Sequence, residues 1–277
     1  GYYFRCATFI SQNGISGFPE LFKVYFANPQ HQITQNPLRV GFIILASIWL
    51  KIFGHSFLNL ALLSLFSYCL FLTIAFSFAR KYFEEQIALL FIILLAFSPL
   101  QMAMARRALI DSTENLFIFS AIWLFWENLN ERKSYKTILF ILVYAFAILI
   151  KEGSVLLSAF FLSYILIKRY IFREAVNLSN FLIETFFSFC IAVIVYITLA
   201  GGSPQFINAM NLVMNSPKIN SYAILYCSGP WFRYLIDFML LSPWVLILAI
   251  SFSVNYILKE DRKKEVTYLI IFSFCFI

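Results

Sequence analysis

Residues 87–126 read IALLFIILLAFSPLQMAM, ARRALIDSTEN and LFIFSAIWLFW, so a charged stretch at 105–115 separates two apolar runs. The longer apolar runs of the chain extend over about 15–24 residues, close to the ~20 residues that a spanning helix needs. Backbone groups in lipid must be satisfied internally, which only helices and closed barrels achieve. Barrel strands would alternate apolar and polar residues, and these runs do not alternate. The sequence therefore predicts an all-α, polytopic transmembrane helix bundle.

The composition supports a membrane protein. Hydrophobic residues make up 61% of the 277 residues and charged residues 13%, with a mean hydropathy of +0.81. Soluble domains have about 45–50% apolar and about 25% charged residues. The net charge of +7 is spread over short loops rather than gathered in one patch, which argues against a nucleic-acid partner. Two distant histidines and five scattered cysteines give neither a zinc spacing nor a disulfide pattern.

The apolar runs predict the domain organisation. We expect a single transmembrane domain over 1–277, with an outer first loop at 1–56 and about eight transmembrane helices in 57–277. The predicted spans are 57–79, 86–104, 112–127, 137–151, 154–172, 181–200, 235–258 and a last one from about 266. We expect a chain cut at both ends, because it begins without Met and ends within an apolar run.

Basic loops predict the orientation. The connections at 80–85, 128–136, 168–174 and 259–265 carry 12 of the 21 Lys and Arg residues. The positive-inside rule places these connections in the cytoplasm and the alternating ones outside. Residues 1–37 then form an outer segment with short interfacial helices, and 37–54 lies in the interface or re-enters. In the alternative, 37–54 spans the membrane and 1–37 is cytoplasmic.

Ionisable residues gather on the predicted outer face. Arg106, Arg107 and Asp111 lie in one connection, and Lys151 and Glu152 lie in the next. Arg107 and Asp111, at i,i+4 spacing, could simply pair at the interface. Arginine, however, grips phosphate through a bidentate fork, and a carboxylate can accept a proton from an acceptor hydroxyl or amine. These residue types suit group transfer from a lipid-linked phosphate.

Five segments, in order, resemble motifs of the GT-C membrane glycosyltransferases that use polyprenyl-phosphate sugars. The branch most similar holds the protein O-mannosyltransferases and the lipid A aminoarabinose transferase. The strongest segment is LLAFSPLQMAMARRALIDSTENLFIF (94–119). The others are GYYFRCATFISQNG (1–14), QNPLRVGFIILASIWLKIFGHS (35–56), ILIKEGSVLL (148–157) and SGPWFRYLIDFMLLSPW (228–244).

The resemblance implies inverting transfer from a dolichyl- or undecaprenyl-type phosphate sugar to a protein, lipid or glycan acceptor on the non-cytoplasmic face. It assigns the outer-face aspartate to Asp111 and expects the family's first-loop catalytic aspartate just before Gly1. It gives Arg106, Arg107 and Lys151 the donor phosphate. Tyr2, Tyr3, Glu152, Trp231 and Tyr234 are the expected substrate contacts. No metal ligands or cofactor are assigned, although participation of a divalent metal stays open. The expected location is a bacterial or archaeal plasma membrane or the endoplasmic reticulum.

Other functions fit parts of the pattern. An O-antigen ligase, a polymerase or an acyltransferase would share the outer-face site. A transporter or flippase would show broken helices in matching halves and ionisable residues at mid-membrane. Pro99 and Pro243 do not fall in matching halves, and the charges avoid the middle of the predicted spans. A scaffold whose charges only pair with one another is the remaining alternative.

Overall fold

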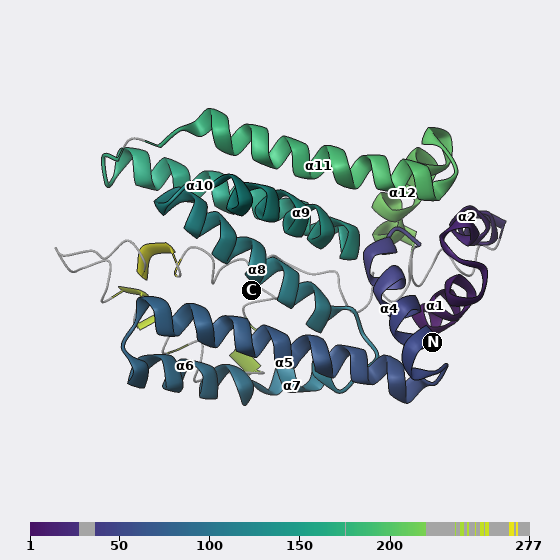
Figure 1. Ribbon diagram of the computed structural model, residues 1–277, viewed down its shortest axis with the longest axis horizontal. Helices are drawn as coiled ribbons and strands as arrows, with labels where there is room; N and C mark the ends of the chain where they lie inside the picture. Colours follow the sequence, from purple (N-terminus) through teal and green to yellow (C-terminus); the bar gives the residue numbers. More distant parts are fainter. Residues whose placement is uncertain are drawn as a thin grey trace. The chain divides into compact units, whose positions relative to one another are not determined.

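The computed structural model describes residues 1–27, 37–174 and 176–219, with isolated positions beyond (Figure 1). Every regular element of the described part is helical, which confirms the predicted all-α fold. The elements are α1 (Tyr2–Asn13), η1 (Ile15–Gly17), α2 (Phe18–Ala27), α4 (Val40–Phe53), α5 (Phe57–Tyr82), α6 (Glu85–Ala96), α7 (Pro99–Ala105), α8 (Asp111–Asn130), α9 (Ser134–Ile150), η2 (Glu152–Leu156), α10 (Leu157–Tyr170), α11 (Leu178–Ala200) and α12 (Ser203–Ile219).

Three helical stretches of the described part are long and apolar enough to cross a bilayer: Phe57–Tyr82, Glu152–Tyr170 and Leu178–Ala200. The pair α6 and α7 makes a fourth if it counts as one bent span. The chain is thus an integral membrane protein by length and composition of its helices. The predicted boundary at residue 56 and the total of about eight spans stay predictions, because the last two predicted spans lie largely outside the described residues.

The predicted span 86–104 is not one straight helix. α6 ends at Ala96, α7 begins at Pro99, and the two helices are bent by 60°. Proline lacks a backbone N–H and disfavours helical geometry in the residue before it, so Ser98 interrupts the helix. Pro99 can open α7 because the first helical position needs no donor.

The chain divides into two compact units. One comprises 1–71, 104–155 and 181–228, and the other 72–103, 156–180 and 229–277. In the second unit, the side chain of Tyr164 packs edge-on against Tyr268, with ring centroids 4.7 Å apart. Lys168 pairs with Glu174 at 3.3 Å, where α10 ends. The first unit holds the described residues of the predicted site.

An antiparallel pair, α8 and α9, is the centre of the first unit (Figure 1). Phe125 of α8 contacts Phe140 of α9 and Phe181 of α11, with ring centroids 6.0 and 5.6 Å apart. Tyr196 of α11 donates a hydrogen bond to the carbonyl of Ile148 at 2.6 Å. The turn at 131–133 is short, so the first residue of α8 and the last of α9 lie at the same end.

A close backbone approach brings α4 to that end. A Cβ atom at Gly41 would lie 2.9 Å from the backbone nitrogen of Ile150. Only glycine permits this approach without a shift of one helix. At 14 residues, α4 is about 21 Å long, shorter than the ~30 Å hydrocarbon core. Its length agrees with the expectation that 37–54 is not a full upright span.

The N-terminal segment forms the predicted short amphipathic helix. The buried residues of α1 are Tyr3, Cys6, Ala7 and Ile10, which follow the i, i+3, i+4, i+7 spacing of one helical face. This face packs on α4, and the ring of Tyr3 meets Phe42 edge-on at 5.3 Å. Packing on α4 therefore places Tyr3 next to the start of that helix.

Candidate active site

Lys151 joins two carboxylates at the open end of the α8–α9 pair. Its Nζ atom lies 2.7 Å from Oε2 of Glu114 and 3.6 Å from Oδ1 of Asp111. Asp111 and Glu114 occupy the first turn of α8, and Lys151 caps the C-terminus of α9. Acidic groups at a helix N-terminus and a cation at a C-terminus are both favourable with respect to the helix dipoles. The local helix ends and the ion pairs therefore stabilise the same arrangement.

Arg39 forms a second group of contacts, beside the ion pairs of Lys151. Its Nη1 donates a short hydrogen bond to the hydroxyl of Tyr3, and its guanidinium carbon lies 5.7 Å from the centre of the Tyr3 ring. Its Nε lies 3.9 Å from Oε2 of Glu152, too far for a hydrogen bond. Burial raises the pKa of Tyr3 to about 12, against the opposing effect of the Arg39 charge, so the phenol stays protonated at neutral pH.

Exposure separates the roles within this outer cluster, which we define as Tyr3, Arg39, Asp111, Glu114, Lys151 and Glu152. The side chain of Glu114 is only 11% exposed, whereas that of Asp111 is 31% exposed. The nearly buried Glu114 therefore holds Lys151 in place. Lys151 in turn holds Asp111 at a position that a substrate can reach. The cluster contains two cations and three carboxylates, so it has a formal charge of −1 before any phosphate arrives.

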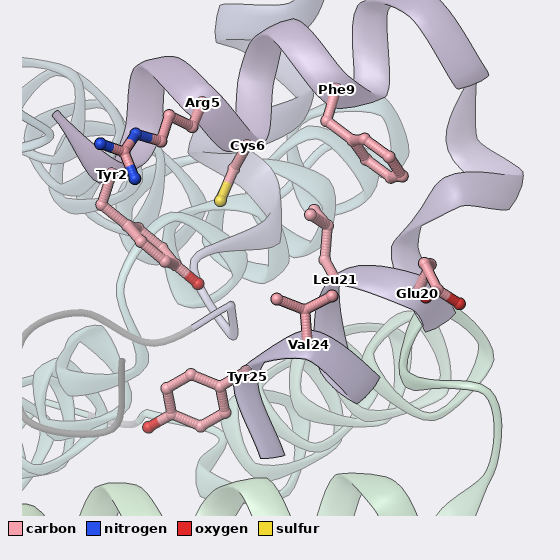
Figure 2. Close-up of a pocket in the computed structure, with 8 residues that line it drawn as sticks. All are labelled: Tyr2, Arg5, Cys6, Phe9, Glu20, Leu21, Val24 and Tyr25. Carbon is pink, nitrogen blue, oxygen red and sulfur yellow. The ribbon is translucent and has the colours of Figure 1, made fainter. Parts of the chain in front are cut away.

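A cleft lies next to the outer cluster, between α1 and α2 (Figure 2). It has a volume of about 280 Å³. The lining residues are Tyr2, Arg5, Cys6 and Phe9 of α1 and Glu20, Leu21, Val24 and Tyr25 of α2. The rings of Tyr2 and Tyr25 stand at one end, where Arg5 also lies, and Phe9 and Glu20 stand toward the other. Burial raises the pKa of the Cys6 thiol to about 11, so this side chain lines the cleft as a neutral thiol at neutral pH.

Comparison with known proteins identifies the family. A family model described as dolichyl-phosphate-mannose-protein mannosyltransferase matches residues 36–198, more than half of the chain. The chain belongs to this mannosyltransferase family. Searches of curated proteins and of solved structures returned no match. The family and the apolar helices together make this protein a membrane glycosyltransferase of mannosyltransferase type.

The matched region contains nearly all of the outer cluster. Arg39, Asp111, Glu114, Lys151 and Glu152 lie within residues 36–198, whereas α1 and α2 precede that region. The cleft and Tyr3 are therefore features of this chain outside the matched part of the mannosyltransferase family.

The structure brings together only some of the predicted site residues. Asp111 and Lys151 meet directly, and Glu152 and Tyr3 meet through Arg39. Tyr2 lines the neighbouring cleft. Trp231 and Tyr234 lie outside the described residues. The nine predicted residues thus include seven that the structure describes. These seven belong to the outer cluster, to the cleft or to a third group that is exposed.

Arg106 and Arg107 form that exposed group, in the connection before α8. Neither arginine forms an ion pair with a described residue. Asp111 is the first residue of α8, so Arg107 is not one helical turn away from it on a shared face. Asp111 pairs with Lys151 instead. The alternative of an Arg107–Asp111 pair is therefore wrong, and both arginines remain available to an anion.

Sequence reasoning missed Arg39 and Glu114. Arg39 lies at the start of the short apolar segment 37–54, and Glu114 lies in the charged stretch 105–115, but neither was assigned a role. A signal did exist for Arg39, because a charged residue that directly precedes an apolar helix often marks a helix end. Among the described residues, no group of three or more His, Cys, Asp or Glu side chains is arranged to hold a metal ion.

Proposed function

We propose that this mannosyltransferase-family protein transfers a sugar from a polyprenyl-phosphate donor to a protein, lipid or glycan acceptor on the non-cytoplasmic face of its membrane. The finer placement, beside the protein O-mannosyltransferases and the aminoarabinose transferase, is part of this proposal. The observation that carries it is Asp111, held by Lys151 at a partly exposed position inside the family-matched region.

The proposed reaction is a displacement at the anomeric carbon of the donor sugar. The acceptor hydroxyl oxygen or amine nitrogen forms a bond to the anomeric carbon as the bond from that carbon to the phosphate oxygen breaks. The phosphate leaves with the electron pair of the broken bond, and the acceptor proton passes to a carboxylate. The resemblance gives the proton to the family's first-loop aspartate, and we assign the orientation of the acceptor to Asp111.

Positive charge stabilises the leaving phosphate. We assign this role to Lys151 and to the exposed Arg106 and Arg107, which have no ion-pair partner among the described residues. Preorganised cations at the position where negative charge develops are among the strongest contributions that an active site makes. Glu152, Tyr2 and Tyr3, with Trp231 and Tyr234 of the later segment, complete the proposed substrate contacts.

The two ends of α8 support the orientation. At 20 residues, α8 is about 30 Å long, close to the thickness of the hydrocarbon core, although it is less apolar than the candidate spans of the described part. The outer cluster lies at its first turn, and the basic turn with Arg132 and Lys133 follows its last. A basic turn on the cytoplasmic side puts Asp111 on the opposite side.

The proposal is tested by assaying the membrane-embedded protein against a panel of polyprenyl-phosphate sugars, with wild type and Asp111→Asn in parallel. We expect turnover of one donor class and a loss of about 100-fold in kcat/KM for Asp111→Asn, the size typical of a general acid–base or orienting group. The matched control is Glu131→Gln, at the other end of α8, with unchanged turnover.

Three outcomes are informative. A wild type that releases sugar from none of the donors contradicts the proposed function and favours a ligase, an acyltransferase or a flippase. Turnover that Asp111→Asn leaves intact keeps the function and removes Asp111 from the site. A loss in both Asp111→Asn and Glu131→Gln points to misfolding, which thermal melting of the two variants detects.

A further inference from the structure

Arg39 is the outer-face cation best prepared to bind an anion. Lys151 already faces two carboxylates, and Arg106 and Arg107 are exposed. Arg39 lies against the Tyr3 ring and is fixed through Nη1. Its Nε is buried and has no hydrogen-bond partner among the described residues. A buried donor without an acceptor is costly, and an incoming phosphate oxygen would supply one.

The rings of Tyr3 and Tyr2 connect Arg39 to the apolar cleft. The Tyr3 ring lies 5.7 Å from the guanidinium carbon and 5.9 Å from the Tyr2 ring, which lines the cleft. A second link is Tyr25, also a cleft residue, whose pKa is raised by burial and by the charge of Glu152. A ligand that bridges these features must be anionic at one end and apolar at the other.

The size of the cleft limits the apolar part. If a methylene group fills about the volume of a water molecule, ~30 Å³, the 280 Å³ cleft holds roughly nine carbons. That corresponds to about two isoprene units. The walls are aromatic and aliphatic, and the exposed Arg5 at the Tyr2 end adds positive charge toward an anionic head group.

We propose that Arg39 and the α1–α2 cleft form one subsite in two parts, which binds the phosphate and the first two isoprene units of the lipid donor. This proposal rests on the proposed function and deepens it. Arg39 binds the phosphate as a fork, as guanidinium groups do with phosphate oxygens, and the cleft receives the chain where it leaves the phosphate. The subsite lies partly outside the family-matched region, since α1 and α2 precede residue 36.

The two parts can be separated by measuring binding of three probes to the protein in nanodiscs: inorganic phosphate, methyl phosphate and geranyl phosphate. For wild type we expect geranyl phosphate to bind about 30-fold more tightly than methyl phosphate, since about 0.8 kcal/mol per buried CH₂ group is partly offset by ordering of the chain. The variants are Arg39→Gln and Val24→Trp, with Lys51→Gln and Ile48→Trp on exposed positions of α4 as matched controls.

Each variant should remove one part. Arg39→Gln should weaken both organic phosphates about tenfold, the loss of one charge-assisted hydrogen bond, and leave their affinity ratio unchanged. Val24→Trp fills the cleft, so it should reduce the ratio to threefold or less and leave methyl phosphate unaffected. Both controls should match wild type.

Other results would overturn the proposal. Unchanged methyl phosphate affinity in Arg39→Gln would make Arg39 a mere tie between Tyr3 and Glu152. Inorganic phosphate that binds as tightly as geranyl phosphate would indicate a free-anion site. An affinity ratio that survives Val24→Trp would place the chain elsewhere. Because binding needs no turnover, a wild type that fails the donor assay but shows this pattern loses the proposed function and keeps the subsite.

Discussion

The two ends of the α8–α9 pair use charge in different ways. At the turn end, Lys133 pairs with Glu131 at 2.6 Å and Lys136 pairs with Glu127 at 3.0 Å. These partners are at most nine residues apart in sequence. At the outer end, Glu114 and Lys151 are 37 residues apart, and Tyr3 and Arg39 are 36 apart. The turn end combines these local pairs with one long-range pair, Arg132 with Glu184 of α11 at 3.1 Å. The outer cluster consists entirely of contacts between distant segments and exists only when four segments meet.

The two ends also differ in how exposed their charged groups are and in whether each of these groups has a hydrogen-bond partner. At the turn end, Lys133 and Glu131 are 46% and 60% exposed, so water can replace either partner, whereas Lys136 and Glu127 are only 10% and 13% exposed. Exposed pairs such as Lys133–Glu131 contribute little to stability, because water screens and replaces them. In the outer cluster, Glu114 is nearly buried and the Nε of Arg39 has no acceptor among the described residues. Charges are buried at both ends, so the distinction rests on the open donor of Arg39. A buried charged group with an unsatisfied donor is more typical of a functional site than of a stabilising one.

The largest expected effect is that of Lys151→Met. The substitution leaves the buried carboxylate of Glu114 without its cation, so we expect a loss of about 2 kcal/mol in stability, less than for a fully buried pair because Lys151 is one-third exposed. Thermal melting in nanodiscs measures it. Lys133→Met, the matched change at the turn end, should leave the melting temperature close to that of wild type, because both partners of this pair are exposed. Equal losses in both variants would erase the distinction between the two ends.

Gly41→Ala should have the next largest effect. The added Cβ would meet the backbone of Leu149 and Ile150 at 2.9 Å, so α4 and α9 must separate. We expect a cost of about 1–2 kcal/mol, in the lower part of the range for overpacked cores, together with lower affinity for the phosphate probes. Gly153→Ala is the control, because a Cβ there has no neighbour within 4 Å. If Gly41→Ala melts like wild type, close approach of α4 does not build the site.

Tyr3→Phe should have a smaller effect. It removes the acceptor of the Arg39 Nη1 hydrogen bond and keeps the ring contact, which should cost about 1 kcal/mol of stability. Tyr135→Phe, at an exposed position of the turn end, should change the melting temperature by less than the error of the measurement. A Tyr3→Phe variant as stable as Tyr135→Phe would show that the Arg39–Tyr3 bond contributes nothing measurable.

The smallest effect should be the pH dependence of the turn end. The hydrogen bond from Lys133 lowers the pKa of Glu131 below its ordinary value of 4.5, and the same bond raises the pKa of Lys133 above 10.5. The contribution of Glu131 is therefore complete above pH 4.5 and is lost as the pH falls through its folded pKa. The contribution of Lys133 is complete below pH 10.5 and is lost as the pH rises further.

The measurement compares wild type with Glu131→Gln. The difference in melting temperature should be constant between about pH 5 and 10 and should shrink outside that window. It should also shrink in high salt, since exposed pairs are screened. A difference that varies around neutral pH would be inconsistent with a simple exposed pair.

The local predictions from sequence succeeded where the cause is local. The amphipathic α1, the long α5 and the spans at α10 and α11 follow from apolar periodicity and run length alone. The bend between α6 and α7 has an equally local cause in Pro99, although the sequence was read as one straight span. A spanning helix satisfies its own backbone within one segment, so its existence needs no information from distant residues.

The site depended on both levels. The sequence by itself determined that Asp111, Lys151 and Glu152 stand at helix ends, because charges avoid the apolar runs. Only the tertiary structure decided that Lys151 pairs with Glu114 and Asp111. It also decided that Arg39 donates a hydrogen bond to Tyr3 and approaches Glu152. Arg106 and Arg107 stay exposed for the same reason. Those partners are fixed by packing, above all by the contact that Gly41 allows between α4 and α9, and packing between segments has no signature in any one of them.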